Sequence, residues 1–286
     1  MKELPGVSAG ETSKELAALL KTLRAQFADE LATPQSATCC SFDPGEPVLG
    51  CFLKSFLLWE STSVKASQAL KRLETGIVDF NELRACMPDE VVRIIGERYP
   101  RAPERALRLR TALNVIFSRE HRVTLEPLAA LGRKEAREHL EKIDGVPSFV
   151  AARVCLLALS HHAAPVDSRI HRRLIEAKVV GADSTIEDAA ITLEKKARAG
   201  ELPEVYLLLQ CWADEANYQP ADSHLADLRP PHKPVAEHVR REQEAARKAA
   251  RKAKLAATRP LRKKNKANER AGGGAGKSSI KKRSGR

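Results

Sequence analysis

The chain has 286 residues and a formal net charge of +12, and 43% of its residues are hydrophobic. This length and apolar content suffice for a folded core, which excludes a wholly disordered protein. No apolar run reaches bilayer length and the first sixteen residues are polar, so neither a membrane span nor a secretory leader is predicted. The expected location is the cytoplasm, with nucleoid association in a bacterium.

The positive charge is concentrated in the C-terminal part of the sequence. Residues 229–286 contain 20 Lys or Arg and 4 Asp or Glu, which leaves residues 1–228 with a net charge of −4. Such a block is typical of an arm that binds polyanions with salt-dependent, sequence-independent affinity. We expect Lys263 and Lys264 to contact DNA phosphates. The alternatives are a solubilising tail or a contact with RNA, a ribosome or an acidic partner.

Apolar residues recur at helical spacing and no segment shows strand alternation, so the predicted fold class is all-α. Residues 1–12 are predicted to be flexible, 13–228 to form a helical domain and 229–286 to be disordered. The helices predicted in chain order cover 13–31, 47–60, 63–73, 79–86, 89–98, 102–120, 125–131, 134–143, 149–159, 168–178, 184–199 and 203–218.

The most informative stretch is residues 134–175. Its first two helices are separated by the turn DGVPS at 144–148, where glycine relieves the backbone and proline ends the preceding helix. The second helix is apolar on nearly every side apart from Arg153, which predicts burial. A short loop then places Asp167 at the N-cap of the next helix.

Four segments together resemble the helix-hairpin-helix DNA glycosylases, the superfamily that includes endonuclease III. IDGVPSFVA (143–151) is similar to the hairpin motif LPGVG[RK]KTA, and VDSRIHR (166–172) is similar to VDTHVxR. LLWEST (57–62) lies where the family carries LSxQT, and YPRAPERALRL (99–109) resembles G[FY]xxKAxx[IL]. The similarity spans about residues 45–215. It implies two helical lobes with the active site between them, one formed by about residues 63–160 and the other by the N-terminal helices with those after Asp167.

The resemblance implies a catalytic role for Asp167. This carboxylate would assist departure of a base by stabilising an oxocarbenium-like sugar and orienting water, as in glycoside hydrolysis. Its N-cap position predicts an ionised carboxylate, because free backbone N–H groups and the positive helix end favour the charged form. The alternative is a helix cap without catalytic function. The catalytic interpretation requires Asp167 to face a groove between the lobes.

Two departures from the family pattern lie in the hairpin. Phe149 stands where bifunctional members carry the Schiff-base lysine, so lyase activity is not expected. Pro147 replaces the second hairpin glycine and has no N–H to offer a phosphate. The amides of Gly145, Val146 and Ser148 remain as candidate DNA ligands, and the hairpin carbonyls as candidate ligands of a monovalent cation.

Other predicted contacts flank Asp167 in the implied site. Glu60 replaces a glutamine that, by resemblance, probes the duplex near the extruded base; a solvated residue beside a helix N-cap is the alternative. Trp59 is interpreted as a core residue rather than a wedge. Arg169 and Arg172 are candidate phosphate ligands, with salt bridges within the lobe as the alternative.

Cysteine spacing argues against a cofactor. None of the six cysteines forms a C-x-x-C pair, and only Cys211 follows Asp167, so the iron–sulfur motif C-x6-C-x2-C-x5-C of many relatives is missing. The resemblance implies a monofunctional DNA N-glycosylase that acts on double-stranded DNA, and a monomer is expected. The rival hypothesis is a catalytically silent DNA-binding module with the same fold.

Overall fold

The structure, a computed structural model, describes residues 9–32, 45–198 and 200–216. These residues form twelve α-helices and one 3-10 helix, with no strand among them, which confirms the all-α class. The tail at 229–286, including Lys263 and Lys264, lies outside the described residues, as do Cys39 and Cys40. The elements are α1 (Ala9–Gln26), α2 (Ala28–Ala32), α3 (Pro47–Leu58), α4 (Ser63–Gly76), α5 (Phe80–Ala85), α6 (Pro88–Ile95), α7 (Ala102–Glu120), η1 (Glu126–Ala130), α8 (Arg133–Glu141), α9 (Ser148–Leu157), α10 (Ser168–Glu176), α11 (Ile186–Lys196) and α12 (Leu202–Glu215).

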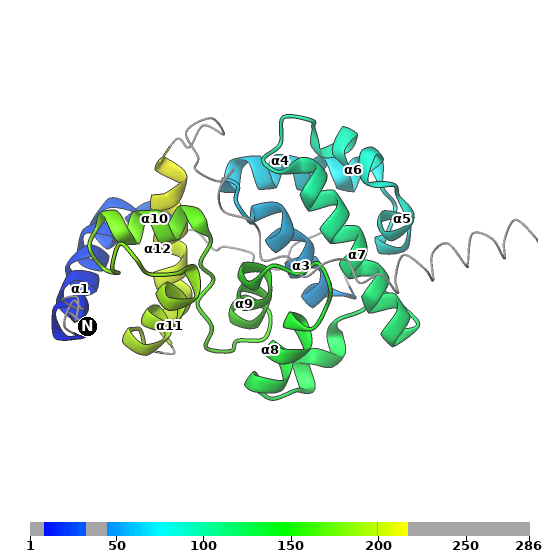
Figure 1. Cartoon of the computed structure of the whole chain (residues 1–286). Coiled ribbons are helices and arrows are strands. Elements are labelled where there is room, and N and C mark those ends of the chain that lie inside the picture. Colours follow the sequence, from blue (N-terminus) through cyan, green and yellow to red (C-terminus); the bar gives the residue numbers. More distant parts are fainter. Residues whose placement is uncertain (1–8, 33–44, 199, 217–286) are drawn as a thin grey trace, which may run out of the picture. The chain divides into compact units, whose positions relative to one another are not determined.

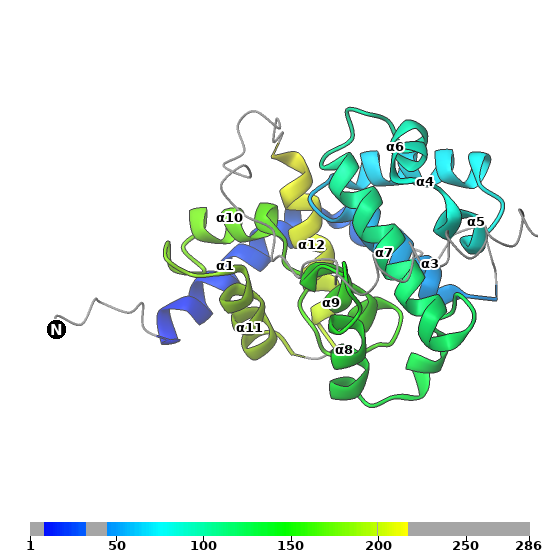
Figure 2. The same cartoon turned by 45° about the vertical axis from the view of Figure 1, so that its right-hand side comes forward.

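The described helices pack as two lobes (Figures 1 and 2). In the first lobe, α3 packs against α4, α7 and α9, while α6 lies on α4 and α7, α5 on α7 and α8 on α9. In the second lobe, α12 packs against α1, α2 and α10, and α10 packs against α11. Contacts of α12 with α4 and α9 join the two lobes. The predicted two-lobed arrangement is confirmed, but α3 belongs to the first lobe although it precedes the expected start at residue 63.

Helix boundaries follow local capping signals. α7 has the predicted bounds, and α11 begins at Ile186 because the hydroxyl of Thr185 accepts a hydrogen bond from the Asp188 N–H at 3.1 Å. The helix predicted over 13–31 is interrupted at Phe27, and it begins at Ala9, so residues 9–12 are helical rather than flexible. None of the helices in the described ranges is both long and apolar enough to cross a bilayer.

Candidate functional site

The hairpin between α8 and α9 is held against α7. Gly145 has a φ of +90°, and a Cβ added to it would lie 2.7 Å from the carbonyl oxygen of Arg108. Both the backbone conformation and the close approach therefore require glycine. Pro147 is the N-cap of α9, and its carbonyl accepts hydrogen bonds from the amides of Val150 and Ala151. The hairpin thus has the predicted turn, in contact with α7.

The turn between α3 and α4 brings a carboxyl group to the start of α10. Glu60 has a φ of +54°, a left-handed conformation that costs a residue with a side chain about 1–2 kcal/mol. Its side chain points inward and only 7% of the residue is exposed. The Glu60 carboxylate accepts hydrogen bonds from both the N–H and the hydroxyl of Ser168, the former at 3.0 Å.

Asp167 completes a reciprocal contact between this turn and α10. One carboxyl oxygen of Asp167 accepts the Ile170 N–H at 2.9 Å, as expected of an N-cap. The other accepts the N–H of Glu60 at 3.2 Å. Each acid therefore binds backbone or hydroxyl groups of the opposite segment. We call Glu60 and Asp167 the acid pair.

The environment of Asp167 differs from the one the cap position predicts. Burial and the neighbouring Glu60 carboxyl raise the pKa of Asp167 to about 7, while Arg169 and the two backbone hydrogen bonds oppose this rise. The cap position alone predicts a lowered pKa, whereas the pKa is raised, because two N–H donors do not offset removal from water beside a second acid. Asp167 is 2% exposed, so in this conformation it does not meet the requirement of facing an open groove.

Arg169 is held within the protein rather than offered to DNA. Its guanidinium donates to the carbonyl oxygen of Ser61 and to a carboxylate oxygen of Asp214, the latter at 2.6 Å. The other Asp214 oxygen accepts the N–H of Ser63 at 2.9 Å, at the start of α4. Only 5% of Arg169 is exposed, so the alternative of a salt bridge holds and the phosphate contact is wrong.

A second buried guanidinium supports the α3–α4 turn from the other side. Arg105 of α7 donates to the carbonyl oxygens of Phe56, Trp59 and Pro100. These acceptors include carbonyls at the C-terminal end of α3, where cations are favourable. Trp59 is 5% exposed, which confirms it as a core residue.

Two more arginines lie over the Trp59 ring on the side of the hairpin. The guanidinium carbons of Arg101 and Arg108 lie 5.3 and 5.5 Å from the centroid of that ring. Both also pair with Glu104, at 3.3 and 2.8 Å. Arg108 is adjacent to the hairpin, because a Cβ added to Gly145 would lie 2.7 Å from its carbonyl oxygen.

The position of the family's Schiff-base lysine is filled by a buried aromatic ring. Phe149 is 2% exposed, and its ring centroid lies 6.4 Å from that of Tyr206. Lys142, the nearest preceding lysine, has a largely exposed side chain paired with Glu138 at 3.3 Å. No amine of the described residues stands at the family's lysine position.

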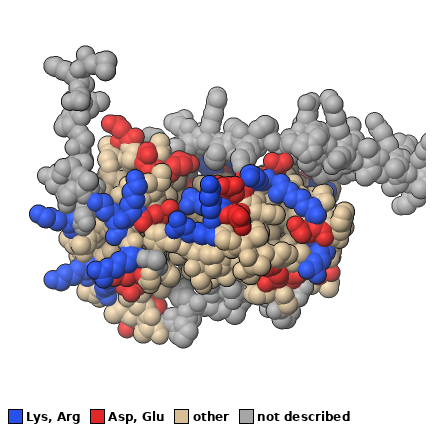
Figure 3. Space-filling view, turned by 90° about the horizontal axis from the view of Figure 1, so that it is seen from below, with Lys and Arg blue, Asp and Glu red and all other residues tan. Residues whose placement is uncertain are grey.

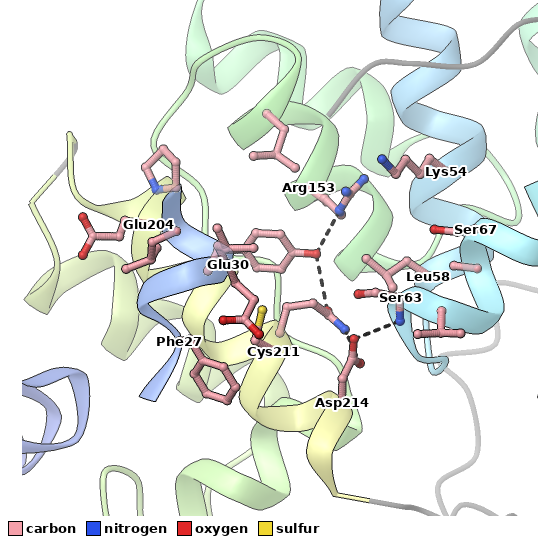
Figure 4. Close-up of a pocket in the computed structure, with 18 of the residues that line it drawn as sticks. Phe27, Glu30, Lys54, Leu58, Ser63, Ser67, Arg153, Glu204, Cys211 and Asp214 are labelled. Carbon is pink, nitrogen blue, oxygen red and sulfur yellow. Dashed lines mark hydrogen bonds between the residues drawn. The ribbon is translucent and has the colours of Figure 1, made fainter. Parts of the chain in front are cut away.

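A cavity of about 940 Å³ lies along α12, where it faces α3, α4 and α9 (Figure 4). Arg153 of α9 donates to the Tyr206 hydroxyl at 2.9 Å, and Gln210 donates to Asp214 at 2.8 Å. Figure 4 shows Asp214 joined to Ser63, and Arg153 on the same side of the cavity as Lys54. Neither Glu60 nor Asp167 lines this cavity, although Asp214 connects its wall to Arg169.

The remaining predicted DNA ligands differ in burial and in hydrogen bonding. Glu60 is buried against Ser168, so the prediction that it probes the duplex is wrong in this conformation. The Val146 amide donates to the Ile143 carbonyl at 3.2 Å, so it is not a free phosphate ligand. Among Gly145, Val146 and Ser148, only Ser148 is exposed. Arg172 is half exposed and pairs with Glu176, and its phosphate contact stays a prediction.

Surface charge in the described part is mixed. On the face seen in Figure 3, Lys and Arg side chains alternate with Asp and Glu rather than forming a single basic field. Within the described residues, no group of three or more His, Cys, Asp or Glu is placed to hold a metal ion. The described cysteines, Cys51, Cys86, Cys155 and Cys211, are free thiols.

The described chain has a fold similar to that of solved DNA glycosylase structures. Endonuclease III in a non-covalent DNA complex superimposes with a TM-score of 0.53 at 16% identity, covering 80% of this chain and 98% of the other. Endonuclease III trapped as a covalent DNA intermediate gives 0.53 and 16%, covering 70% and 85%. The Clostridium acetobutylicum 8-oxoguanine glycosylase/lyase, bound to double-stranded DNA, gives a TM-score of 0.52 at 18% identity, covering 74% of this chain and 72% of the other.

These likenesses establish the fold that the sequence motifs predicted. The sequence itself matches no family model and no curated protein. The motifs did not reveal the partners of several important residues, although Arg105 and Ser168 lie within them. Asp214, Arg105 and Ser168 act through partners far away in the chain, whereas Arg153 was marked as the one charged residue of an apolar helix.

Proposed function

We propose that this protein binds duplex DNA and hydrolyses the glycosidic bond of a damaged or mismatched base without cutting the strand. The observation that carries the proposal is the acid pair at the start of α10. A helix N-terminus can be capped by Ser, Thr or Asn without burying a charge. Two acids buried in one contact are costly, and acids perturbed in this way are concentrated at functional sites.

In the proposed reaction, Asp167 acts at the sugar carbon that carries the extruded base. Breaking the glycosidic bond develops positive charge on the sugar, and a carboxyl group beside it stabilises that charge and orients water. Extrusion costs least for a base that is already mispaired or damaged, which contributes to selection of the lesion. Because Phe149 offers no amine, no Schiff base forms and the strand stays intact.

The closed contact sets a condition on this chemistry. With 2% of Asp167 exposed, a sugar reaches its carboxyl group only after the α3–α4 turn moves away from α10. We propose that contacts with DNA supply the free energy for this separation, as binding energy drives other active sites into their reactive geometry. Ser148 of the hairpin and Arg108 beside it, with Arg101 at the start of α7, are the residues proposed to make these contacts.

A DNA-binding protein without catalytic activity is the second candidate. The burial of Asp167 favours it, because a helix cap sealed from solvent needs no access. This candidate shares the fold and the DNA-binding face but predicts no base release from any substrate.

The discriminating experiment compares full-length wild type with Asp167→Asn on duplexes containing uracil, oxidised pyrimidines, 8-oxoguanine mispairs or alkylpurines. We expect wild type to release one class of base, leaving a strand that breaks only after alkali. The substitution should slow release about 10²-fold or more while duplex affinity is retained. Asp79→Asn, which removes the N-cap carboxylate of α5, is the matched control and should release base normally. Failure of wild type to release a base from any duplex, with duplex binding retained, supports the second candidate.

A further inference from the structure

The acid pair has a geometry that a simple helix cap does not require. Glu60 is in the left-handed conformation, and this conformation directs its N–H toward Asp167 while its side chain reaches Ser168. Strained residues of this kind persist where the surrounding structure holds them, and they cluster at functional sites. The two carboxyl groups therefore lie in one buried contact between the α3–α4 turn and the start of α10. The hydrogen bonds of this contact join residues that are 107 or 108 positions apart in the sequence.

No cation neutralises the pair directly through a hydrogen bond in the described structure. Arg169 is the nearest basic group on α10, and its hydrogen bonds go to Ser61 and Asp214. Arg105 of α7 is attracted by Glu60, but its hydrogen bonds go to carbonyl oxygens. The remaining titratable groups that act on this cluster are Tyr99, before α7, and Tyr206 and Asp214 of α12.

We propose that Asp167, buried beside the Glu60 carboxyl group at the start of α10, keeps its proton at neutral pH and that this proton is delivered to the departing base. The inference rests on the proposed function and specifies its acid. Like charges in one buried contact cannot both ionise at low cost, so one carboxyl keeps its proton. The raised pKa of Asp167, to about 7, agrees with this arrangement. Glu60 is then a positioning residue, because it acts through Asp167.

The glycosidic bond breaks with both electrons passing to the base nitrogen, and the Asp167 carboxyl transfers its proton to the base. This leaves an oxocarbenium-like sugar beside a newly formed carboxylate. Water then adds to the sugar carbon and returns one proton to Asp167, which restores the pair. Water is the only co-reactant.

The first test follows the proton without DNA. Full-length protein labelled with ¹³C at the Asp and Glu side-chain carboxyl carbons is titrated by NMR as wild type, Glu60→Gln, Asp167→Asn and Asp79→Asn. We expect one carboxyl step near pH 7 in wild type and in Asp79→Asn, and none in Asp167→Asn. In Glu60→Gln the step should move to lower pH, because a neutral neighbour removes the repulsion. Absence of the wild-type step, or an unchanged midpoint in Glu60→Gln, overturns the proposal.

The second test measures base release against pH on the preferred duplex. Delivery of a proton predicts a wild-type rate that falls above about pH 7, and a fall beginning at lower pH in Glu60→Gln. At pH 7.5 the substitution should therefore slow release about tenfold, with rates alike at pH 5. A faster Glu60→Gln at pH 7.5 means that the ionised form reacts, which refutes the proton's role. The NMR step without base release at any pH refutes the proposed function and, with it, that role.

Discussion

Asp167 carries a carboxyl group whose proton affinity differs between the folded and the unfolded chain. In the fold, burial and Glu60 raise its pKa from 3.8 to about 7. Between these values the folded state keeps a proton that the unfolded state has lost, so stability falls as pH rises. Below the unfolded value both states are protonated, and above about 7 both are ionised. Asp167 therefore makes the free energy of unfolding depend on pH only between these two pKa values.

This window gives a prediction that needs no substrate. Between about pH 4 and 7, Asp167 should lower the free energy of unfolding by up to about 1.4 kcal/mol per pH unit. Asp167→Asn should remove this contribution, so urea denaturation at pH 5 and pH 8 should give a smaller difference than in wild type. Asp79→Asn, at an unrelated N-cap, should keep the wild-type difference. Equal differences in all three proteins would contradict the assignment.

Among the helices and turns, the hairpin has the most restricted geometry. Gly145→Ala combines a φ of +90° with a Cβ placed 2.7 Å from the Arg108 carbonyl, which is backbone and moves only with α7. We expect a loss of about 1–3 kcal/mol in the free energy of unfolding, measured by urea denaturation. Gly181→Ala is the control, because an added Cβ meets nothing within 4 Å there, and it should be nearly neutral. A similar loss of stability in the two variants would contradict this prediction, because it would show that the hairpin backbone can shift to accommodate a Cβ at position 145.

The sequence predicted elements better than it predicted their contacts. The bounds of α7 were predictable because a proline lies in its first turn and the helical spacing of apolar residues continues along its length. The break at Phe27 was not, because the apolar stripe of residues 16–27 runs without interruption into it. The motifs located Asp167 and the hairpin. They could not show that Glu60 turns inward, since its partner Ser168 lies 108 residues away and no local pattern records that pairing.

For the whole molecule, the charge distribution predicts that nonspecific affinity for DNA comes from the C-terminal tail rather than from the helical domain. Residues 1–228 have a net charge of −4, whereas residues 229–286 carry 20 basic side chains. In the hairpin, Pro147 lacks an N–H and the Val146 amide is occupied, so neither offers an amide to a phosphate. Most of the salt-dependent affinity for undamaged duplex should therefore come from the tail.

Deleting residues 229–286 tests this division. The truncated protein should bind undamaged duplex at least about tenfold more weakly at low salt, with a shallower dependence of log affinity on log salt, because fewer counterions are released. Fluorescence anisotropy across a salt series measures both quantities. Thermal unfolding of the truncated protein serves as the control for folding. An unchanged salt slope would assign the phosphate contacts to the helical domain instead.

The hydrogen bonds between Glu60 and Ser168 link access to Asp167 with the integrity of α10. Ser168 is the first residue of that nine-residue helix, and its amide finds its acceptor in the other lobe's turn. Separation of the α3–α4 turn from α10 removes the acceptor of this amide, so exposure of the aspartate by that movement leaves an unsatisfied N–H at the start of α10. Water, or an oxygen of the incoming nucleic acid, must then occupy the vacated position, which makes the terminus of α10 sensitive to what has entered.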